Sequence, residues 1–377
     1  MNILYVHNVG KIGGAERVTL DVIRGLDKRI HRAIVVTPED GPFLAAAREL
    51  GAQASALKIQ QPDLKKPLAT MLSYRRWLNF LRQNEIDLIH TGDLFVTRTL
   101  IRNANQLSIP LVCHVHFPID ASALNWIFKI GSDNCHFVYC SQELHDTVAP
   151  RIETVLKAAS HQVIHNGVDV DRFKAFEAQK RLLPTERTNI GIVANLQERK
   201  GHLDLIEAIS TLYPNHPDIC VHIIGGDLFG ESRMSFLRKR IGELELDDVF
   251  VFHGQVNNVR DYLNELDILV CASHEEAFPI SILEAMAFEL KIVSTDVNGI
   301  PEALTHEYSG LLVHPHNSAQ MAKNIERYLK GDGSENKLGL QARKVVVERF
   351  SLSRFNEQIQ RLYQQLNQQK METSNLI

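Results

Sequence analysis

The sequence lacks the patterns that are typical of disulfide frameworks, cysteine-based zinc sites and membrane-spanning helices. Its 377 residues include only five cysteines, an odd number without any C-x-x-C pair, so neither a disulfide framework nor a zinc site is indicated. Buried free thiols in a reducing compartment are the simplest interpretation. No run approaches the roughly 20 apolar residues that cross a bilayer. The net charge of -4 argues against bulk binding of nucleic acid but leaves room for a local basic patch.

The N-terminal segment also lacks the basic start of a signal peptide. Met1–Val6 has the pattern of a strand and runs directly into polar turn residues. We therefore expect a cytoplasmic protein, with peripheral attachment to the inner face of the cell membrane as an open alternative.

The length indicates two domains of α/β type. At 377 residues the chain exceeds the usual limit of a single core. Short apolar strands alternate with longer helical patterns, which is typical of parallel sheets covered by helices. The candidate strands are Asn2–His7, Arg32–Thr37, Leu88–His90, Leu111–His114, Phe137–Cys140 and Gln162–His165 in the first half, and Asn189–Ala194, Cys220–Gly225, Val249–His253, Ile268–Cys271 and Lys291–Thr295 in the second.

The domain boundary is expected between residues 180 and 181. The stretch 178–188 is polar, contains Pro184 and has no strand pattern. We therefore predict one Rossmann-like domain over residues 1–180 and a second over residues 181–352. The last helical pattern, over residues 353–369, is expected to pack back on the first domain.

A glycine-rich turn follows the first predicted strand. Gly10, Gly13 and Gly14 lie close together in the segment Val9–Arg17. A turn of this kind lets the backbone approach a phosphate or a sugar, although a purely structural turn fits the pattern equally well. The spacing is not G-x-G-x-x-G, and it is not a P-loop because no Gly-Lys-Ser/Thr follows. Dinucleotide binding, nicotinamide dehydrogenase activity and ATP hydrolysis are therefore disfavoured.

Two glutamates, Glu276 and Glu284, frame a predicted junction between a loop and a helix. On one helix their side chains would point roughly 80° apart, so they cannot share one helix face. Proline is favoured at the first helical position, and Pro279 therefore indicates that Glu276 lies on the loop and Glu284 inside the helix. The amides of Ile280 and Ser281 would then form an anion site at the helix N-terminus.

Carboxylates beside such an anion site suit a nucleotide-sugar, because one can bind a sugar hydroxyl and the other a ribose diol. A capped surface helix with two solvated acids is the alternative. The flanks favour ligand binding, since 263–273 predicts a helix end followed by a buried strand and 291–295 predicts the next strand. Open parallel sheets bind their ligands at the carboxyl ends of strands.

Five segments, taken in order, resemble those of the retaining glycosyltransferases of family 4, which have the GT-B architecture. The resemblance covers nearly the whole chain, and the set is specific although each segment alone is weak. It implies two Rossmann-like domains that face each other across a cleft. The segments are Gly13–Glu16, His116 within 112–118, Val163–Phe173, Gly191–His202 and the Glu276/Glu284 motif.

This resemblance implies transfer of a sugar from a nucleoside-diphosphate-sugar to a glycan or lipid-linked glycan. The anomeric configuration would be retained, UDP-sugars are favoured over GDP-sugars, and neither a metal nor another cofactor is expected. His116 would contact the donor sugar near the reacting carbon, Lys200 would be the main phosphate-binding cation, and Glu276 would hold sugar hydroxyls. The departing phosphate oxygen is expected to take the acceptor proton, so no protein base is named.

By the same resemblance, the predicted site residues divide among the parts of the donor. The catalytic set is His116, Glu276 and Lys200. The phosphate-binding residues are Gly14, Asn195, Arg199, Lys200, Ile280 and Ser281. The donor-sugar residues are Glu276, Ala277, Phe278 and Pro279, and the residues for ribose and base are Glu284, Gly254, Gln255 and Val256.

One position departs from the family pattern. The family usually has an arginine a few residues before the lysine, where this chain has Asn195. An amide can donate a hydrogen bond but does not replace a planar guanidinium that grips two phosphates. Either Arg199 compensates or the pocket relies on Lys200 alone. A non-catalytic nucleotide-sugar-binding module is therefore one alternative, and an epimerase or hydrolase of the same architecture is another.

One amphipathic segment bears on the acceptor. Residues 64–82 have Leu, Met, Trp and Phe at helical spacing together with five Lys/Arg, and residues 125–129 contain Trp126. A basic apolar face of this kind is typical of binding to an anionic membrane surface, which would point to a lipid-linked acceptor. A core-packing helix with a solvated basic side is the alternative, and we slightly favour it.

Overall fold

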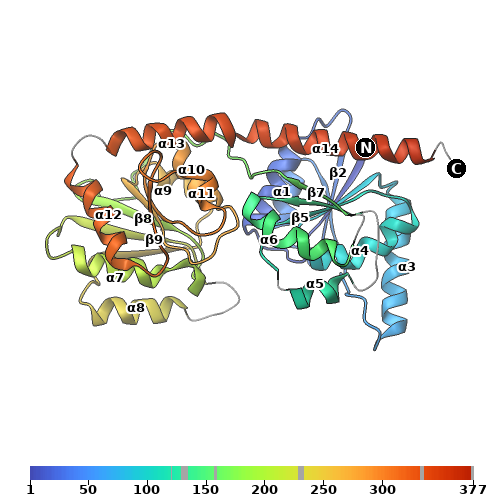
Figure 1. Cartoon of the computed structure of the whole chain (residues 1–377), viewed down its shortest axis with the longest axis horizontal. Helices are drawn as coiled ribbons and strands as arrows, with labels where there is room; N and C mark the ends of the chain where they lie inside the picture. The colour runs from blue at the N-terminus through green and yellow to red at the C-terminus, as the bar shows by residue number, and fades with distance from the viewer. Residues whose placement is uncertain (120, 129–134, 157–158, 228–232, 332–334, 375–377) are drawn as a thin grey trace. The chain divides into compact units, whose positions relative to one another are not determined.

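The computed structural model describes residues 1–119, 121–128, 135–156, 159–227, 233–331 and 335–374. They divide into two compact units, drawn in Figure 1. Unit 1 comprises Met1–Gly167 with Leu352–Ile377, and unit 2 comprises Val168–Ser351. Each unit is an open parallel sheet covered by helices, which confirms the predicted pair of Rossmann-like α/β folds.

Unit 1 is built on a seven-stranded parallel sheet with the order β3-β2-β1-β4-β5-β6-β7. Strands β1, β4 and β5 at its centre are buried along almost their whole length, because helices cover both faces. The strands are β1 (Asn2–Val6), β2 (Arg32–Thr37), β3 (Gln53–Ala56), β4 (Leu88–Thr91), β5 (Leu111–Val115), β6 (Cys135–Tyr139) and β7 (Ser160–Val163).

The helices of unit 1 form a layer on each face of this sheet. In Figure 1, α1 (Gly14–Gly25) and α14 (Leu352–Ser374) lie on one face, and α4 (Leu94–Gln106) and α5 (Ala121–Ile127) lie on the other. Further helices of the unit are α2 (Pro42–Glu49), α3 (Pro67–Gln83) and α6 (Gln142–Glu153).

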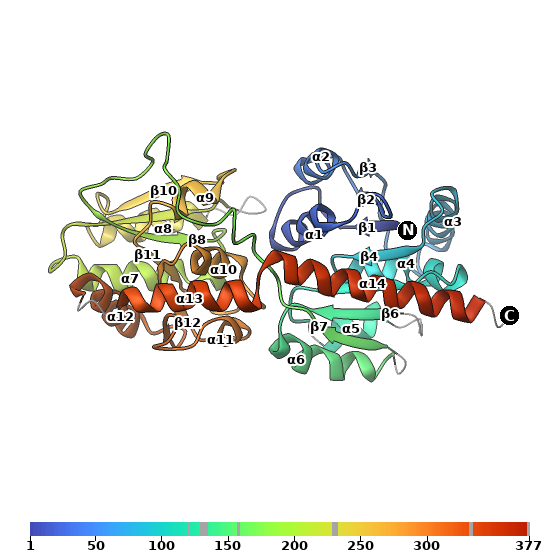
Figure 2. The same cartoon turned by 90° about the horizontal axis from the view of Figure 1, so that it is seen from above.

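The C-terminal helix α14 belongs to unit 1 although it follows unit 2 in the sequence (Figure 2). The side chain of Gln360 donates to the carbonyl of Gly25, the last residue of α1, at 2.8 Å. The hydroxyl of Tyr363 lies 2.5 Å from Nδ1 of the buried His90 and 3.3 Å from the hydroxyl of Tyr5. This helix corresponds to the helical pattern predicted over residues 353–369.

Unit 2 contains a six-stranded parallel sheet with the order β10-β9-β8-β11-β12-β13. Figure 1 shows α7 (His202–Leu212) and α8 (Arg233–Glu243) on one face of it, and α10 (Ile280–Ala287) and α13 (Glu335–Arg349) on the other. The strands are β8 (Thr188–Val193), β9 (Ile219–Ile224), β10 (Phe250–Gly254), β11 (Ile268–Cys271), β12 (Lys291–Thr295) and β13 (Leu311–Val313). Further helical elements are the 3-10 turn η1 (Glu198–Lys200), α9 (Val259–Leu263), α11 (Ile300–Ala303) and α12 (Ser318–Lys330).

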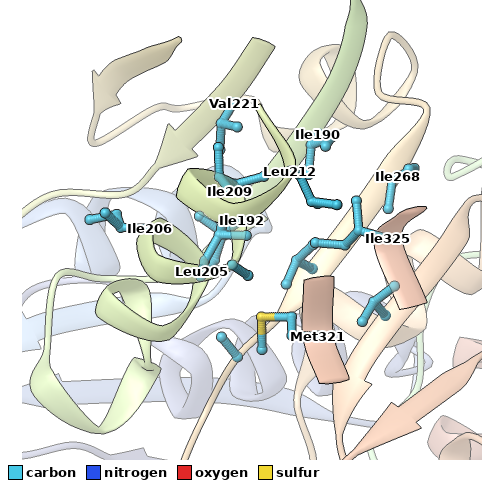
Figure 3. Close-up of a cluster of buried hydrophobic side chains, with 14 of the residues drawn as sticks. Ile190, Ile192, Leu205, Ile206, Ile209, Leu212, Val221, Ile268, Met321 and Ile325 are labelled. Carbon is cyan, nitrogen blue, oxygen red and sulfur yellow. The ribbon is translucent and has the colours of Figure 1, made fainter. Parts of the chain in front are cut away.

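A buried hydrophobic cluster fixes α7 on the sheet of unit 2 (Figure 3). It joins Ile190 and Ile192 of β8 to Leu205 and Ile209 of α7 and to Ile325 of α12. Truncation of a leucine in such a cluster costs about 2–5 kcal/mol of folding free energy. The anchoring matters for function because η1, directly before α7, carries Lys200.

The predicted strands all occur in the structure, with ends shifted by no more than two residues. Two strands were not predicted, β3 and β13, and both lie at an edge of their sheet. Their sequences explain this: β3 reads QASA without a large apolar side chain, and β13 has only three residues. Strand β3 therefore lacks an apolar run, and the apolar run of β13 is shorter than the four to eight residues by which a strand is identified.

The domain boundary differs from the prediction. The structure divides the chain at residues 167/168 and 351/352, whereas residues 180/181 were expected. The polar stretch 178–188 is fastened to unit 2, because the amides of Leu182 and Leu183 donate to the carboxylate of Glu265 at 2.9 and 2.8 Å. The polar composition of this stretch therefore does not mark a linker between the units, because the stretch is hydrogen-bonded to unit 2.

Candidate functional site

The strand order of unit 2 changes direction at β8. This strand pairs with β9 on one side and with β11 on the other. In open parallel sheets such a switch point is where ligands bind, because the loops that leave the two neighbouring strands diverge there. The loops after β8 (194–201) and after β11 (272–279) carry most of the residues predicted to bind phosphate and sugar.

Lys200 and Glu276 meet at this switch point. The ammonium of Lys200 forms an ion pair with Oε1 of Glu276, and the hydroxyl of Ser273 donates to the same oxygen at 3.0 Å. Only 14% of the Lys200 side chain and 11% of the Glu276 side chain are exposed. Charges so far removed from water need a partner, and here each supplies the other. The pair keeps a cation and a carboxylate side by side, so that an anionic ligand can take the place of Glu276 at the Lys200 ammonium.

Backbone contacts hold the two loops together. Gly201, between η1 and α7, has a φ of 66°, and a Cβ at this position would lie 1.8 Å from the carbonyl oxygen of Ala272. The amide of His274 donates to the carbonyl of Arg199 at 2.7 Å. In return, Nη1 of Arg199 donates to the carbonyl of Glu275 at 3.2 Å. The turn that carries Lys200 is therefore packed directly on the loop that carries Glu276.

Helix α10 begins where Pro279 predicted. Pro279 is its N-cap and the helix runs over Ile280–Ala287, so Glu276 lies on the preceding loop and Glu284 inside the helix. Glu284 is buried, with 2% of its surface exposed, whereas Ile280 and Ser281 at the N-terminus are partly accessible. The helix start and the places of the two glutamates therefore agree with the motif, and the anion site at its first amides stays a prediction.

The loop after β12 fixes the backbone around Glu276. The amide of Glu276 donates to Oδ1 of Asn298 at 3.2 Å, and the amide of Gly299 donates to the Glu276 carbonyl at 3.3 Å. The hydroxyl of Thr295, at the end of β12, donates to the carbonyl of Ser273 at 2.6 Å. Three neighbouring strand ends, those of β8, β11 and β12, thus position one carboxylate.

Glycines occupy the ends of β9 and β10. Gly225 has a φ of 150°, and a Cβ there would lie 1.9 Å from the carbonyl oxygen of Ala194. Its amide donates to the carbonyl of Gly254, which has a φ of 66°. Asn195 follows Ala194 and is partly buried. The expected base-binding residues are Gly254, the last residue of β10, and Gln255 and Val256, which follow it. Strand β10 lies two positions from β8, the strand that precedes the Lys200 loop.

In unit 1, polar side chains gather at the carboxyl end of β1. Nδ1 of His7 lies 3.0 Å from Oε1 of Glu16, and Nε2 lies 2.8 Å from the hydroxyl of Thr19. Oε2 of Glu16 accepts a hydrogen bond from the amide of Gly13 at 2.9 Å. Burial raises the pKa of Glu16, but the hydrogen bond and electrostatic attraction of His7, together with backbone hydrogen bonds, outweigh it, and the net pKa is below its usual value. Glu16 thus ties the glycine turn to His7.

Gly14 differs from its neighbour Gly13. It is the first residue of α1, and within the described part of the chain no heavy atom lies within 4 Å of a Cβ built on it. A Cβ on Gly13 would lie 2.9 Å from Oε2 of Glu16. The turn therefore combines a glycine held by Glu16 with a glycine that borders open space.

His116 follows β5 and continues a column of buried imidazoles. Its ring lies 4.2 Å from that of His114, which lies 5.5 Å from that of His90 (centroid distances). Burial lowers the pKa of His116 to about 3, reinforced by His7, and it lowers the pKa of His90 to about 3 as well. Among the described residues, Nε2 of His116 has no hydrogen-bond partner. At neutral pH His116 therefore offers a neutral hydrogen-bonding nitrogen and no positive charge.

Sequence reasoning did not assign roles to several residues that shape these two regions. Ser273 lay in a segment that the sequence had singled out and Asn298 follows the predicted strand 291–295, but their bonds to Glu276 depend on how loops from different strands meet. Glu16 lay in the glycine turn, and its contact with His7 depends on the packing of α1 against β1. The signal in the sequence that could have identified these three residues is that each is polar and lies near a glycine or a carboxylate.

Fold and site together define a class of protein. Two Rossmann-like units each gather polar side chains at the carboxyl ends of parallel strands, with His116 and Gly14 in unit 1 and the other predicted site residues in unit 2. Two family models match consecutive parts of the chain. Glycosyltransferase Family 4 matches residues 12–172, and Glycosyl transferases group 1 matches residues 173–345. The chain belongs to the family 4 glycosyltransferases, with the GT-B fold.

Individual relatives are distant in sequence and similar in fold. A glycogen synthase of Mycobacterium tuberculosis is 24% identical over 276 residues, which are 70% of this chain and 65% of that protein. The lipopolysaccharide core biosynthesis mannosyltransferase LpsB of Rhizobium meliloti is 30% identical over 162 residues, 40% of this chain and 45% of that protein. The crystal structure of Anabaena Alr3699/HepE in complex with UDP and glucose has a TM-score of 0.83 at 21% identity, covering 96% of this chain and 98% of that chain.

Proposed function

We propose that this chain transfers a hexose from a UDP-sugar to a glycan or lipid-linked glycan, with retention of the anomeric configuration and without a metal in the reaction. The observation that carries the proposal is the Lys200–Glu276 pair at the switch point of unit 2, beside the N-terminus of α10. The complex of HepE with UDP and glucose supports UDP over GDP as the donor nucleotide.

The diphosphate gains negative charge as its bond to the anomeric carbon breaks. Lys200 and the amides of Ile280 and Ser281 are suited to stabilise that charge, because they are fixed before the reaction begins. Asn195 and Arg199 contribute further N–H donors in this proposal. When phosphate binds Lys200, Glu276 exchanges the ammonium for hydroxyls of the donor sugar.

The remaining predicted residues complete the donor site. Ala277, Phe278 and Pro279 border the sugar in this proposal, and Phe278 and Pro279 are buried and so give the loop a fixed shape. Glu284 binds the ribose diol. The base lies against Gly254, Gln255 and Val256 and is held mainly through backbone groups.

His116 does not act as a general acid in this mechanism, because its pKa of about 3 leaves it neutral. His116 donates or accepts a hydrogen bond at the donor sugar. The acceptor oxygen bonds to the anomeric carbon on the face from which the diphosphate departs. The departing phosphate oxygen takes the acceptor proton, so one C–O bond replaces another and the charge balances.

A thermal-shift panel with UDP, GDP, CDP, ADP and NAD, without added metal, tests the donor site. A ligand at about 100 times its Kd stabilises a protein by roughly 2.7 kcal/mol, so a shift of several degrees with UDP alone is expected. The anomeric proton of the product, followed by NMR, then reports retention. A flat panel, or a shift with NAD only, contradicts the proposal.

Two outcomes separate the alternatives. Consumption of UDP-sugar in the absence of any acceptor identifies an epimerase or hydrolase. A UDP shift without turnover on a panel of glycans and lipid-linked glycans identifies a non-catalytic binding module. Both outcomes leave the Lys200–Glu276 site in place and replace the reaction assigned to it.

We further propose that unit 1 binds an anionic membrane surface, where a lipid-linked acceptor resides. Helix α3 has two apolar stripes. Trp77 and Leu81 are buried in unit 1, whereas Leu68 and Leu72, about one turn apart, expose 72% and 60% of their surface. Leu64, in the turn before the helix, is 90% exposed. One face of the segment therefore packs in the core, as expected, and the exposed apolar face supports the proposed membrane contact.

Basic and aromatic residues lie beside the exposed stripe. Lys58, Lys65, Lys66 and Trp126 line a surface hollow of about 590 Å³. The guanidinium of Arg98 lies 3.9 Å from the ring centroid of Trp126. Residue 129 of the expected patch 125–129 lies outside the described residues. Of the helices that the structure describes, none combines the length and apolar character needed to cross a bilayer.

Co-sedimentation with anionic vesicles at low salt tests this attachment. Leu68→Glu with Leu72→Glu should abolish binding, because it places two carboxylates on the apolar stripe. Leu340→Glu is the matched control, since Leu340 is 56% exposed and lies on α13 of unit 2. Equal sedimentation of the α3 variant and the control, or no binding by the parent chain, contradicts the proposal.

A further inference from the structure

Three potential metal ligands converge in unit 2 beside the η1 turn. They are Asp204, His274 and His316, and one ligand atom from each lies within 4.8 Å of the other two. Nε2 of His274 is 2.8 Å from Oδ2 of Asp204, and Nδ1 of His316 is 3.9 Å from the same oxygen. The two imidazole rings lie 3.7 Å apart between centroids. One carboxylate and two imidazoles therefore surround a single point.

Each ligand comes from a different segment. Asp204 lies in the first turn of α7, and its amide donates to the carbonyl of Gly201 at 3.0 Å. His274 lies on the loop after β11, where its amide bonds to Arg199. His316 lies in the turn between β13 and α12 and has 68% of its side chain exposed. Two ligands are thus held in place, and the third borders solvent.

We propose that Asp204, His274 and His316 form a binding site for a divalent transition-metal ion of the zinc class. Two imidazoles with one carboxylate suit Zn²⁺ and its neighbours better than Mg²⁺ or Ca²⁺, which prefer oxygen ligands. Zinc bonds of about 2.0–2.2 Å in a tetrahedron place ligand atoms about 3.4 Å apart. The separations of 2.8 and 3.9 Å bracket that value, so His316 must approach Asp204 and His274 must move away from it, each by roughly 0.5 Å. Three protein ligands leave the fourth position open to water.

The location connects this site to the donor site. A bound ion would tie the loop 272–279 to the start of α7 and to the turn after β13. The same loop carries Glu276, and the turn directly before α7 carries Lys200. Metal occupancy would therefore hold together the two segments that position the Lys200–Glu276 pair. This consequence for donor binding rests on the proposed function, whereas metal binding itself does not.

The test uses the full chain without an affinity tag, stripped with a chelator and desalted. Titration with ZnCl2 by calorimetry should give one ion per chain, and CoCl2 should give the visible absorption bands of a tetrahedral site. His316→Asn and Asp204→Asn should each weaken binding at least about 10-fold, which is the loss seen when mere outer partners of a metal site are changed. Zinc should also raise the Tm of the parent chain and not that of the variants.

His314→Asn is the matched control. Nδ1 of His314 lies 2.7 Å from Oδ2 of Asp296 and its side chain is 83% exposed, so it forms a surface His–Asp pair of the same kind. No third ligand joins that pair among the described residues. The control should keep the affinity of the parent chain. Circular dichroism verifies that the variants are folded.

Absence of binding at micromolar free zinc, or equal affinity in the parent chain, the His316 variant and the His314 control, would overturn the site. The UDP shift measured with and without zinc separates the two proposals. Zinc binding without any UDP shift retains the metal site and rejects the donor site. A UDP shift without zinc binding does the reverse.

Discussion

Each unit places polar side chains at the carboxyl ends of the strands of its own parallel sheet. The two sets differ in charge. In unit 2, the ammonium of Lys200 and the carboxylate of Glu276 form an ion pair on loops that retain some access to solvent. In unit 1, His90, His114 and His116 are stacked and neutral because burial lowers their pKa. An ion pair can exchange partners with a charged ligand, whereas a neutral stack provides shape and hydrogen-bonding nitrogens.

The difference originates in where the side chains stand on the strands. His90 lies within β4 and His114 within β5, so the helix layers of unit 1 cover them. Helix α14 completes the cover, since Tyr363 bonds to His90 and the ring of Phe355 lies 6.4 Å from that of His114. Lys200 and Glu276 instead follow their strands and lie on loops. Charge is thus retained on loops that keep some access to solvent and removed where side chains are buried, as for His116 just after β5.

Lys200→Ala should produce the largest effect. In the proposed mechanism it removes the main cation opposite the leaving phosphate, and loss of one fixed donor of this kind costs about 2.7–4 kcal/mol, or at least about 100-fold in kcat/KM. Initial rates with UDP-sugar measure it. The variant also leaves the Glu276 carboxylate without its ammonium partner, so its folded state must be verified by thermal unfolding before the rates are compared.

Lys330→Ala is the control for that change. Lys330 also forms an ion pair in unit 2, with Glu326 at 2.8 Å, but its side chain is 66% exposed. Exposed pairs contribute about 0–1 kcal/mol, so neither stability nor turnover should change appreciably. Near-normal kcat/KM in Lys200→Ala would remove the phosphate assignment and, with it, the contrast between the two units.

Acid should destabilise unit 1 through its neutral histidines. The pKa of His90 and of His116 is about 3 in the folded protein, against about 6.5 in an unfolded chain. As the pH falls, the unfolded state takes up protons first. The stability from each neutral histidine is therefore complete above about pH 6.5 and is lost progressively between about pH 6.5 and about pH 3. The expected loss between pH 7 and pH 5 is about 2 kcal/mol per histidine.

Urea unfolding at pH 7 and pH 5 measures this loss. Both tryptophans of the chain, Trp77 and Trp126, lie in unit 1, so their fluorescence reports on that unit. His116→Gln should lessen the pH dependence by the share of one histidine. If the pH dependence is the same with and without His116, that imidazole is not held neutral by burial, and its assignment as an uncharged hydrogen-bonding group fails.

The sequence predicted all the central strands but only two of the four edge strands, β7 and β10. Central strands such as β1 and β12 are apolar runs because both of their faces are buried. Edge strands such as β3 need no such run, and their place is set by pairing with a neighbour that is already formed. Periodicity also could not show which apolar stripe of α3 is buried, since apolar spacing does not say which of two stripes meets the core.

The site was predictable in its parts and not in its assembly. Pro279 correctly indicated the start of α10 from local chemistry alone. The pairing of Lys200 with Glu276 joins positions 76 residues apart, and only the adjacency of β8 and β11 brings them together. The same holds for Asp204 and His274, which are 70 residues apart. No spacing rule applies at such separations, because the sheet order decides which loops meet.

Two glycines offer the smallest and sharpest comparison of the units. Gly14→Ala should keep or slightly raise stability, by up to about 1 kcal/mol, because alanine favours a helix and a Cβ there meets open space. Turnover should fall roughly tenfold, since the methyl group enters space assigned to the donor phosphates and acceptor.

Gly201→Ala should instead destabilise by about 1–3 kcal/mol or more, because its φ is 66° and its Cβ would overlap the Ala272 carbonyl. Thermal unfolding of both variants measures the change in stability, and kcat/KM measures the change in turnover. Full activity in Gly14→Ala would make the unit 1 turn structural, leaving the glycine turn of unit 2 as the one packed against a binding loop.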